Sequence, residues 1–151
     1  MPDSFTMPYR NDQLPMELDR SILVVGLRGR ILGLDRSTGE LRWENKLGLD
    51  VGKGAYKEVR LEMRYGAVIA SGFTNTIYRI DYQSGNTLWK AYTSASGPAT
   101  IVIEADCVIV AKDGYLDCFS LDGECLWKQP LSGKGHGSVA LGFPGNVQQA
   151  D

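Results

Sequence analysis

The chain has one histidine, three cysteines and no long apolar run among its 151 residues. A lone histidine, His136, is weak support for catalysis and cannot build a zinc site by itself. No apolar run approaches the roughly 18 residues that a membrane-spanning helix needs. Sixteen basic and eighteen acidic residues are interspersed and leave a net charge of −2. This balance argues against the basic field of a nucleic-acid-binding protein and against a polybasic membrane patch.

The cysteines show no C-x-x-C spacing, and their odd number leaves at least one thiol unpaired. Counting outward from the adjacent turns places Cys107 opposite Ser120, and Ser120 opposite Cys125. The two outer thiols are then two strand spacings apart, about 10 Å, which is beyond the reach of a disulfide. We expect buried structural thiols at Cys107, Cys118 and Cys125, with a redox or metal role as the alternative.

The two ends of the chain lack clear patterns. Residues 1–20 contain no apolar segment of the kind that directs secretion, which predicts a cytoplasmic protein without membrane or nucleic-acid partners. Residues 1–20 and 143–151 carry proline and polar residues without periodicity. We therefore expect an N-terminal arm and a C-terminal tail that are poorly ordered.

A hairpin signature, by contrast, occurs three times. It covers residues 29–43, 75–89 and 114–127, and every copy ends in Gly-x-x-x-Trp. The glycine–tryptophan pairs are Gly39 and Trp43, Gly85 and Trp89, and Gly123 and Trp127. The tryptophans are 46 and 38 residues apart, a spacing typical of propeller blades. Asp35, Asp81 and Asp122 occupy matching positions in the copies, where we expect them to accept backbone N–H bonds in turns.

Alternating β-branched and aromatic runs between turn residues predict strands from residue 21 to 142, and no segment has helical periodicity. The expected strands are Ile22–Leu27, Arg30–Asp35, Glu40–Lys46, Lys57–Met63, Ala67–Gly72, Thr76–Asp81, Thr87–Ala91, Ala99–Glu104, Cys107–Ala111, Tyr115–Ser120, Glu124–Lys128 and Ser138–Gly142. They make three four-stranded blades in permuted order, near 21–47, 57–92 and 99–130, with 138–142 as a closing strand. The predicted fold class is all-β, a β-propeller. If the strand Lys57–Met63 lines a central channel, its charged residues make the channel polar; solvated or paired charges are the alternative.

The segment Leu34–Trp43, Leu-Asp-x-x-x-Gly-Glu-Leu-x-Trp, resembles the PQQ-like, quinoprotein-type β-propeller repeat. Ile80–Trp89 and Leu121–Trp127 are the second and third copies, and the resemblance covers about residues 21–142. It implies that the glycine opens the outermost strand and that the tryptophan packs between neighbouring blades. Quinone-dependent dehydrogenases of this type resemble one another in eight blades, adjacent cysteines and a calcium site. This sequence has three repeats and no adjacent cysteines, so we expect no enzymatic activity and no cofactor or metal.

Three blades are too few to close a ring, because propellers normally have four to eight. The hypothesis is a homodimer in which Ser138–Gly142 of each copy pairs with Ile22–Leu27 of the other and closes a six-bladed ring. The expected assembly edge consists of Ile22, Val24, Val139 and Leu141. Other self-assemblies, and completion by a different protein, remain open.

The leading functional hypothesis is a non-enzymatic scaffold that presents a ring to a protein partner, either a second copy or another protein. The alternative is a small-ligand or anion-binding protein that uses two Gly-Lys-Gly linkers on one face of the ring. Its candidate contacts are Lys53, Gly54, Lys134, Gly135 and His136. Turn formation alone also explains these linkers, and a structural subunit of a larger assembly is a third possibility.

Overall fold

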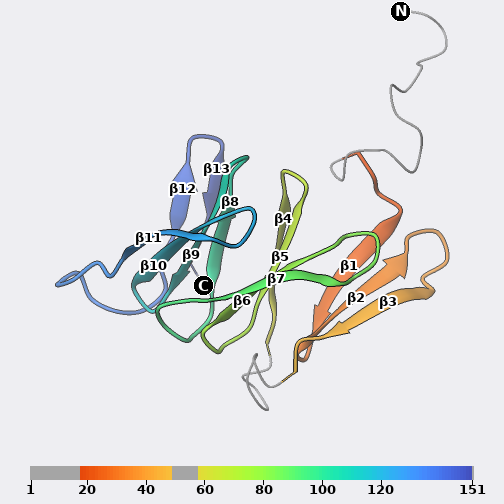
Figure 1. The fold of residues 1–151 in the computed structure, drawn as a ribbon, viewed down its shortest axis with the longest axis horizontal. Helices are drawn as coiled ribbons and strands as arrows, with labels where there is room; N and C mark the ends of the chain where they lie inside the picture. Colours follow the sequence, from red (N-terminus) through yellow and green to blue (C-terminus); the bar gives the residue numbers. More distant parts are fainter. Residues whose placement is uncertain (1–17, 49–57, 151) are drawn as a thin grey trace, which may run out of the picture.

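The computed structural model describes residues 18–48 and 58–150, in which β-strands are joined by turns and short linkers (Figure 1). The strands are β1 (Ile22–Leu27), β2 (Arg30–Asp35), β3 (Leu41–Lys46), β4 (Arg60–Arg64), β5 (Ala67–Ser71), β6 (Thr76–Ile80), β7 (Thr87–Tyr92), β8 (Thr100–Ile103), β9 (Cys107–Lys112), β10 (Tyr115–Ser120), β11 (Cys125–Gln129), β12 (Leu141–Phe143) and β13 (Asn146–Gln148). Within these ranges, no helix has the length and apolar character needed to cross a bilayer.

The strands form antiparallel sheets in chain order, which are the blades of a propeller. β1–β3 form the first blade, β4–β7 the second, β8–β11 the third, and β12 and β13 form a hairpin beside β8. Figure 1 shows the three blades next to one another, and the inner strands β4 and β8 are in contact. Among the described residues, the first blade has no strand corresponding to β4 and β8. The predicted all-β propeller fold with four-stranded blades is confirmed.

Hydrophobic cores fill the spaces between adjacent blades, because each strand directs alternate side chains to opposite faces of its sheet. The core between the first and second blades contains Ile22, Val24, Ile31, Trp43, Leu47, Val68, Ala70, Tyr78, Ile80 and Tyr82. The core between the second and third blades contains Ala67, Ile69, Ile77, Ala99, Ile101, Ile103, Val108, Val110 and Phe119. Both faces of the second blade are therefore buried, as propeller packing requires.

The outer hairpin of every blade has the same irregularity in register. The shift follows Gly33 in the first blade, Arg79 in the second and Cys118 in the third. Two residues later the chain enters the turn, so Asp35, Asp81 and Ser120 are equivalent. The N–H of each bonds to the carbonyl across the turn, at Glu40, Asn86 and Glu124 respectively.

The prediction that Asp122 matches Asp35 and Asp81 is therefore wrong. Ser120 takes that position because the third turn is one residue shorter, with Glu124 four positions after Ser120 where Glu40 is five after Asp35. The Ser120 hydroxyl accepts the N–H of Asp122 at 3.3 Å and that of Glu124 at 3.1 Å. In the other two turns the Asp35 and Asp81 carboxylates accept backbone N–H bonds from Ser37 and Ser84.

The cysteine positions are partly as predicted. Cys107 lies opposite Ser120, but the register shift places Cys125 opposite Phe119. All three thiols are free. Burial raises the pKa of Cys118 to about 12, which keeps this thiol protonated. The expected burial is found at Cys118 but not at Cys107, which is half-buried, or at Cys125, which lies on the exposed strand β11.

The C-terminal residues also differ from the prediction. Instead of one strand at Ser138–Gly142, β12 begins at Leu141, and the chain reverses at Gly145 with φ of 77° and returns as β13. Asn146 is 4 % exposed, and its amide donates to the carbonyl of Ile103 at 2.7 Å. The prediction of a single strand is wrong because the Pro-Gly turn allows a short hairpin to fold beside β8.

Candidate interaction site

The two internal blade junctions share one arrangement of tryptophan and glycine. The Trp43 indole N–H donates to the carbonyl of Tyr82 in the second blade at 3.0 Å. The Trp89 indole N–H donates to the carbonyl of Leu121 in the third blade at 2.8 Å. Each ring lies directly on a glycine of the following blade: a Cβ added to Gly123 would lie 2.7 Å from Trp89 Cδ2, and one added to Gly85 would overlap Trp43. Glycine is therefore required where the ring lies on the turn.

The last tryptophan, Trp127, and the first glycine, Gly39, are not packed against each other's kind in this way. The Trp127 side chain, on the third blade, is 45 % exposed, whereas Trp43 is 9 % exposed. At the other end of the array, a Cβ added to Gly39 would have no heavy atom within 4 Å. The packing of tryptophan between blades is thus present at Trp43 and Trp89, while the third tryptophan and the first glycine lie at the two open ends.

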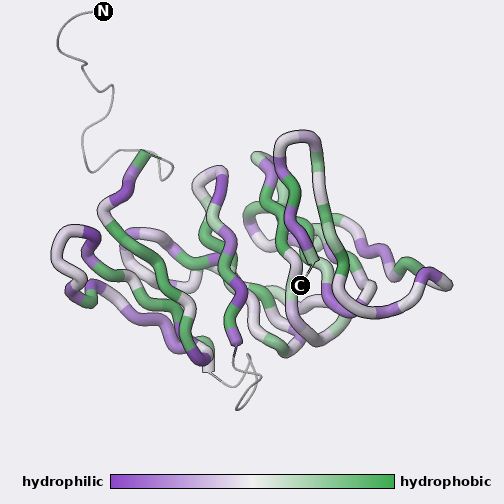
Figure 2. The backbone as a smooth tube through the Cα atoms, turned by 180° about the vertical axis from the view of Figure 1, so that it is seen from behind, coloured by the Kyte–Doolittle hydropathy of each residue, from purple (hydrophilic) through white to green (hydrophobic). Residues whose placement is uncertain are grey.

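The open face of the first blade is apolar. Leu23, Val68 and Val108 are equivalent, because they lie opposite Leu34, Ile80 and Phe119 in the three blades. Val68 and Val108 are at most 1 % exposed, whereas Leu23 is 58 % exposed. Figure 2 shows that hydrophobic stretches continue through the strands of this terminal sheet, as they do in the inner ones. The first blade therefore presents a face that the other blades bury.

A groove of about 610 Å³ follows the same edge. Its lining includes Ile22, Leu23 and Val24 of β1, Gly39 of the turn, and Met63 of β4. The Ser21 carbonyl accepts the N–H of Arg36, the residue directly after β2. In this antiparallel register, the backbone N–H and C=O groups of Ile22 and Val24 therefore point away from β2.

The Tyr82 hydroxyl bonds to the backbone groups of one residue, Ile22, on this open edge of β1. It accepts the N–H of Ile22 at 3.0 Å and lies 2.8 Å from the Ile22 carbonyl. The groove next to Val24 therefore has the backbone groups and the apolar lining that an added β-strand needs. Ile22 and Val24 themselves are buried, and Val139 and Leu141 are half-buried at the other end of the array.

A buried lysine connects the second and third blades. The Lys112 side chain is 1 % exposed, and its ammonium donates to the carbonyls of Gly72, Thr74 and Thr76. Burial lowers the pKa of Lys112 to about 7, against the opposing effect of the negative charge of Asp117.

Asp117 is also buried, and it accepts two bonds from Ser94, at 2.8 Å from the N–H and 2.6 Å from the hydroxyl. The burial of these two residues could not be predicted from the sequence, because a single polar residue in a strand usually marks a solvent-facing position.

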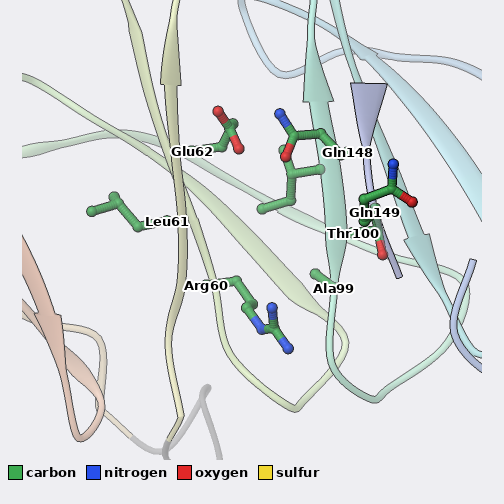
Figure 3. A pocket seen from close by; sticks show the side chains of 8 residues that line it. Arg60, Leu61, Glu62, Ala99, Thr100, Gln148 and Gln149 are labelled. Atoms are coloured by element: carbon green, nitrogen blue, oxygen red, sulfur yellow. The ribbon is translucent and has the colours of Figure 1, made fainter. Parts of the chain in front are cut away.

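The inner strands β4 and β8 enclose a small polar cavity of about 70 Å³ together with Gln148 and Gln149 (Figure 3). The side chains of Arg60 and Glu62 point from β4 toward β8, while Leu61 points to the other side of the strand. Burial raises the pKa of Glu62. Arg60 and Glu62 thus face the third blade across this cavity.

The candidate anion-binding residues do not converge in the described part of the chain. Lys53 and Gly54 lie outside the described residues. Lys134, Gly135 and His136 are exposed, and their linker folds onto the turn between β9 and β10. The His136 ring lies 6.1 Å from that of Tyr115, centroid to centroid, and its Nδ1 is 3.4 Å from the carbonyl of Asp113. Within residues 18–48 and 58–150, no three His, Cys, Asp or Glu side chains are grouped to hold a metal ion.

The family model and the curated relative that match this chain carry the same description. A family model described as "Outer membrane protein assembly factor BamB" matches residues 11–150. The protein of that name from Francisella tularensis is 26 % identical over 123 residues, which cover 80 % of this chain and 25 % of the relative. The chain thus spans about a quarter of the length of this curated relative.

Solved structures show the same fold. BamB from Moraxella catarrhalis is 24 % identical with a TM-score of 0.59, and the match covers 82 % of this chain and 38 % of that one. The computationally designed Ika8 protein is 20 % identical with a TM-score of 0.62, covering 85 % and 42 %. A europium-containing methanol dehydrogenase is 13 % identical with a TM-score of 0.53, covering 71 % and 22 %, which is a likeness of fold alone.

These findings overturn the predicted cytoplasmic location. The matching family and the curated relative are both named for assembly at the outer membrane. The prediction rested on the absence of a secretion-type segment in residues 1–20, and that absence does not determine where a protein resides.

Proposed function

Because the chain belongs to the family of the outer membrane protein assembly factor BamB, we propose that it is a protein-interaction scaffold and not an enzyme. The observation that supports this most is the pair of open ends, each with one half of a blade junction. The relative's name describes an assembly factor, and the likeness to a dehydrogenase rests on fold alone. The exposed, non-convergent linker at Lys134 and His136 gives the anion-binding alternative no comparable support.

The partner that we propose for the open ends is a second copy of the chain, and the C-terminal hairpin supports this choice. Phe143 pairs with Asn146 across the Pro-Gly turn as Arg64 pairs with Ala67 across the Tyr-Gly turn of the second blade. The hairpin β12–β13 therefore corresponds to β4–β5, and β12 is the type of strand that the described part of the first blade lacks.

The correspondence also sets a register. β5 pairs Ile69 with Glu62, and the equivalent pair across two copies is Val24 with Leu141. Leu141 then lies beside the core that holds Val24, where an apolar side chain is stabilised by burial. In this assembly, β1 of the second copy replaces β13 as the partner of β12, and two such exchanges close a six-bladed ring with two-fold symmetry.

A mixed cross-linking experiment tests this proposal. Cys107 and Cys125 are changed to serine, one preparation then receives Val24→Cys and the other Leu141→Cys, and the two are mixed with a short bismaleimide. We expect a covalent product of two chains, because the proposed register places the two thiols opposite each other. The products are separated on a denaturing gel and the cross-linked residues are located by mass spectrometry.

The matched control replaces Val24→Cys by Leu23→Cys. Leu23 is more exposed than Val24, so random collision would cross-link it more, whereas strand pairing directs it to the opposite face. Equal or greater yield with Leu23→Cys, or no covalent product with Val24→Cys, contradicts the proposed pairing.

A further inference from the structure

We propose that Trp127 of one copy lies on the Gly39 turn of the second copy and donates its indole N–H to the carbonyl of Arg36. This inference rests on the proposed self-assembly and names the residues that would hold its junction. It extends to the open ends an arrangement that the chain already forms twice, at Trp43 with Gly85 and at Trp89 with Gly123.

Trp127 has the position of a junction residue. In each outer hairpin, the first residue of the outer strand that pairs beyond the register shift is Cys125 on β11 and Thr87 on β7. Trp127 and Trp89 each lie two residues after it. Trp89 is packed against the next blade, whereas about half of the Trp127 side chain is in contact with solvent. A large, partly exposed aromatic ring contributes strongly to binding free energy when an interface buries it.

The Gly39 turn has the features of an acceptor. Gly39 and Gly85 have the same φ of 77°, and each N–H bonds to the carbonyl of the aspartate four residues before it. The carbonyl that receives Trp43 belongs to Tyr82, directly after Asp81, and the carbonyl that receives Trp89 belongs to Leu121, directly after Ser120. The equivalent residue in the first turn is Arg36, directly after Asp35.

The occupant is a second copy because one chain carries both complementary halves at opposite ends of its array. The exposed ring is on the third blade, and the bare glycine is on the first. When two copies meet at both ends, Trp127 of each copy lies on the Gly39 turn of the other. The same contact covers the apolar face at Leu23.

The test compares Gly39→Asn with Gly48→Asn. Asparagine tolerates positive φ better than other side chains, and a Cβ at either glycine meets no heavy atom within 4 Å in the single chain. Both variants are therefore expected to fold. Only Gly39→Asn places a Cβ where the ring of Trp127 would lie. We expect it to raise the dissociation constant of the dimer by about 30-fold or more, as for other interface tryptophans, with Gly48→Asn close to the native value.

Trp127→Ala provides the second measurement, by sedimentation velocity on the full chain with circular dichroism to verify the fold. We expect a weakening similar to that of Gly39→Asn and little further loss when the two are combined, because both remove the same contact. A native dimer that neither substitution weakens overturns the Trp127 contact and leaves self-assembly intact. A native chain that remains a monomer overturns both.

Discussion

The three tryptophans have the same sequence surroundings and different environments. Trp43 and Trp89 each bond to a carbonyl of the following blade, whereas Trp127 is 45 % exposed. The signature Gly-x-x-x-Trp could be recognised from the sequence, and it predicted the packing between blades. It could not distinguish the third ring from the first two, because burial depends on whether another blade follows and not on the local motif.

This difference predicts unequal effects on stability. Trp89→Ala is expected to lower the free energy of unfolding by about 3–5 kcal/mol, because it leaves a cavity at a junction. Trp127→Ala, measured at concentrations where the chain is a monomer, is expected to change it by no more than about 0.5 kcal/mol. Urea unfolding followed by circular dichroism measures both values. Equal losses for the two variants would mean that the third ring is as buried as the second.

Lys112 predicts a specific dependence of stability on pH. Its pKa of about 7 in the folded chain is below the ordinary value of 10.5, so between these values the unfolded chain binds more protons. The free energy of unfolding therefore rises with pH in this window as far as this group is concerned.

The variant Lys112→Met removes that contribution while keeping a long side chain in the space between the blades. Urea unfolding of both proteins at several pH values above 7 is the measurement, and the native chain is expected to gain stability relative to the variant as pH rises. Parallel pH profiles for the two proteins would show that Lys112 titrates alike in the folded and unfolded chains.

The strands of the blades were predictable where their periodicity is long enough to recognise. Arg30–Asp35, Tyr115–Ser120 and Ile22–Leu27 have the predicted bounds, because six residues of alternating character fix a strand and its turns. The hairpin β12–β13 was not predicted, since three-residue strands show no period and the second begins with polar Asn146. The Asn146 side chain is buried where its amide donates to the Ile103 carbonyl and the Glu104 carboxylate, more than 40 residues away in the sequence.

The candidate site was predictable only in part. The proposed edge residues Ile22 and Val24 came from strand order, since the first blade has three strands among the residues that the structure describes. The groove beside them depends on Met63 and Tyr82 of the next blade, so it could not be read from β1 alone. The buried lysine of β9 was missed for the same reason, because its carbonyl partners, between Gly72 and Thr76, belong to another blade.

In the whole molecule, the surfaces that the proposed contacts would bury lie at the two ends of the array of blades. Three blades leave an apolar face at Leu23 on one side and an exposed ring at Trp127 on the other. Apolar surfaces of this kind mark interaction sites. We propose that a second copy covers both.

The molar mass in solution tests this proposal most directly. Multi-angle light scattering behind gel filtration, repeated over a range of loading concentrations with the full chain, is expected to give a mass that approaches twice 16.6 kDa as concentration rises. A mass of 16.6 kDa at every concentration, with the chain soluble and folded, would contradict the account.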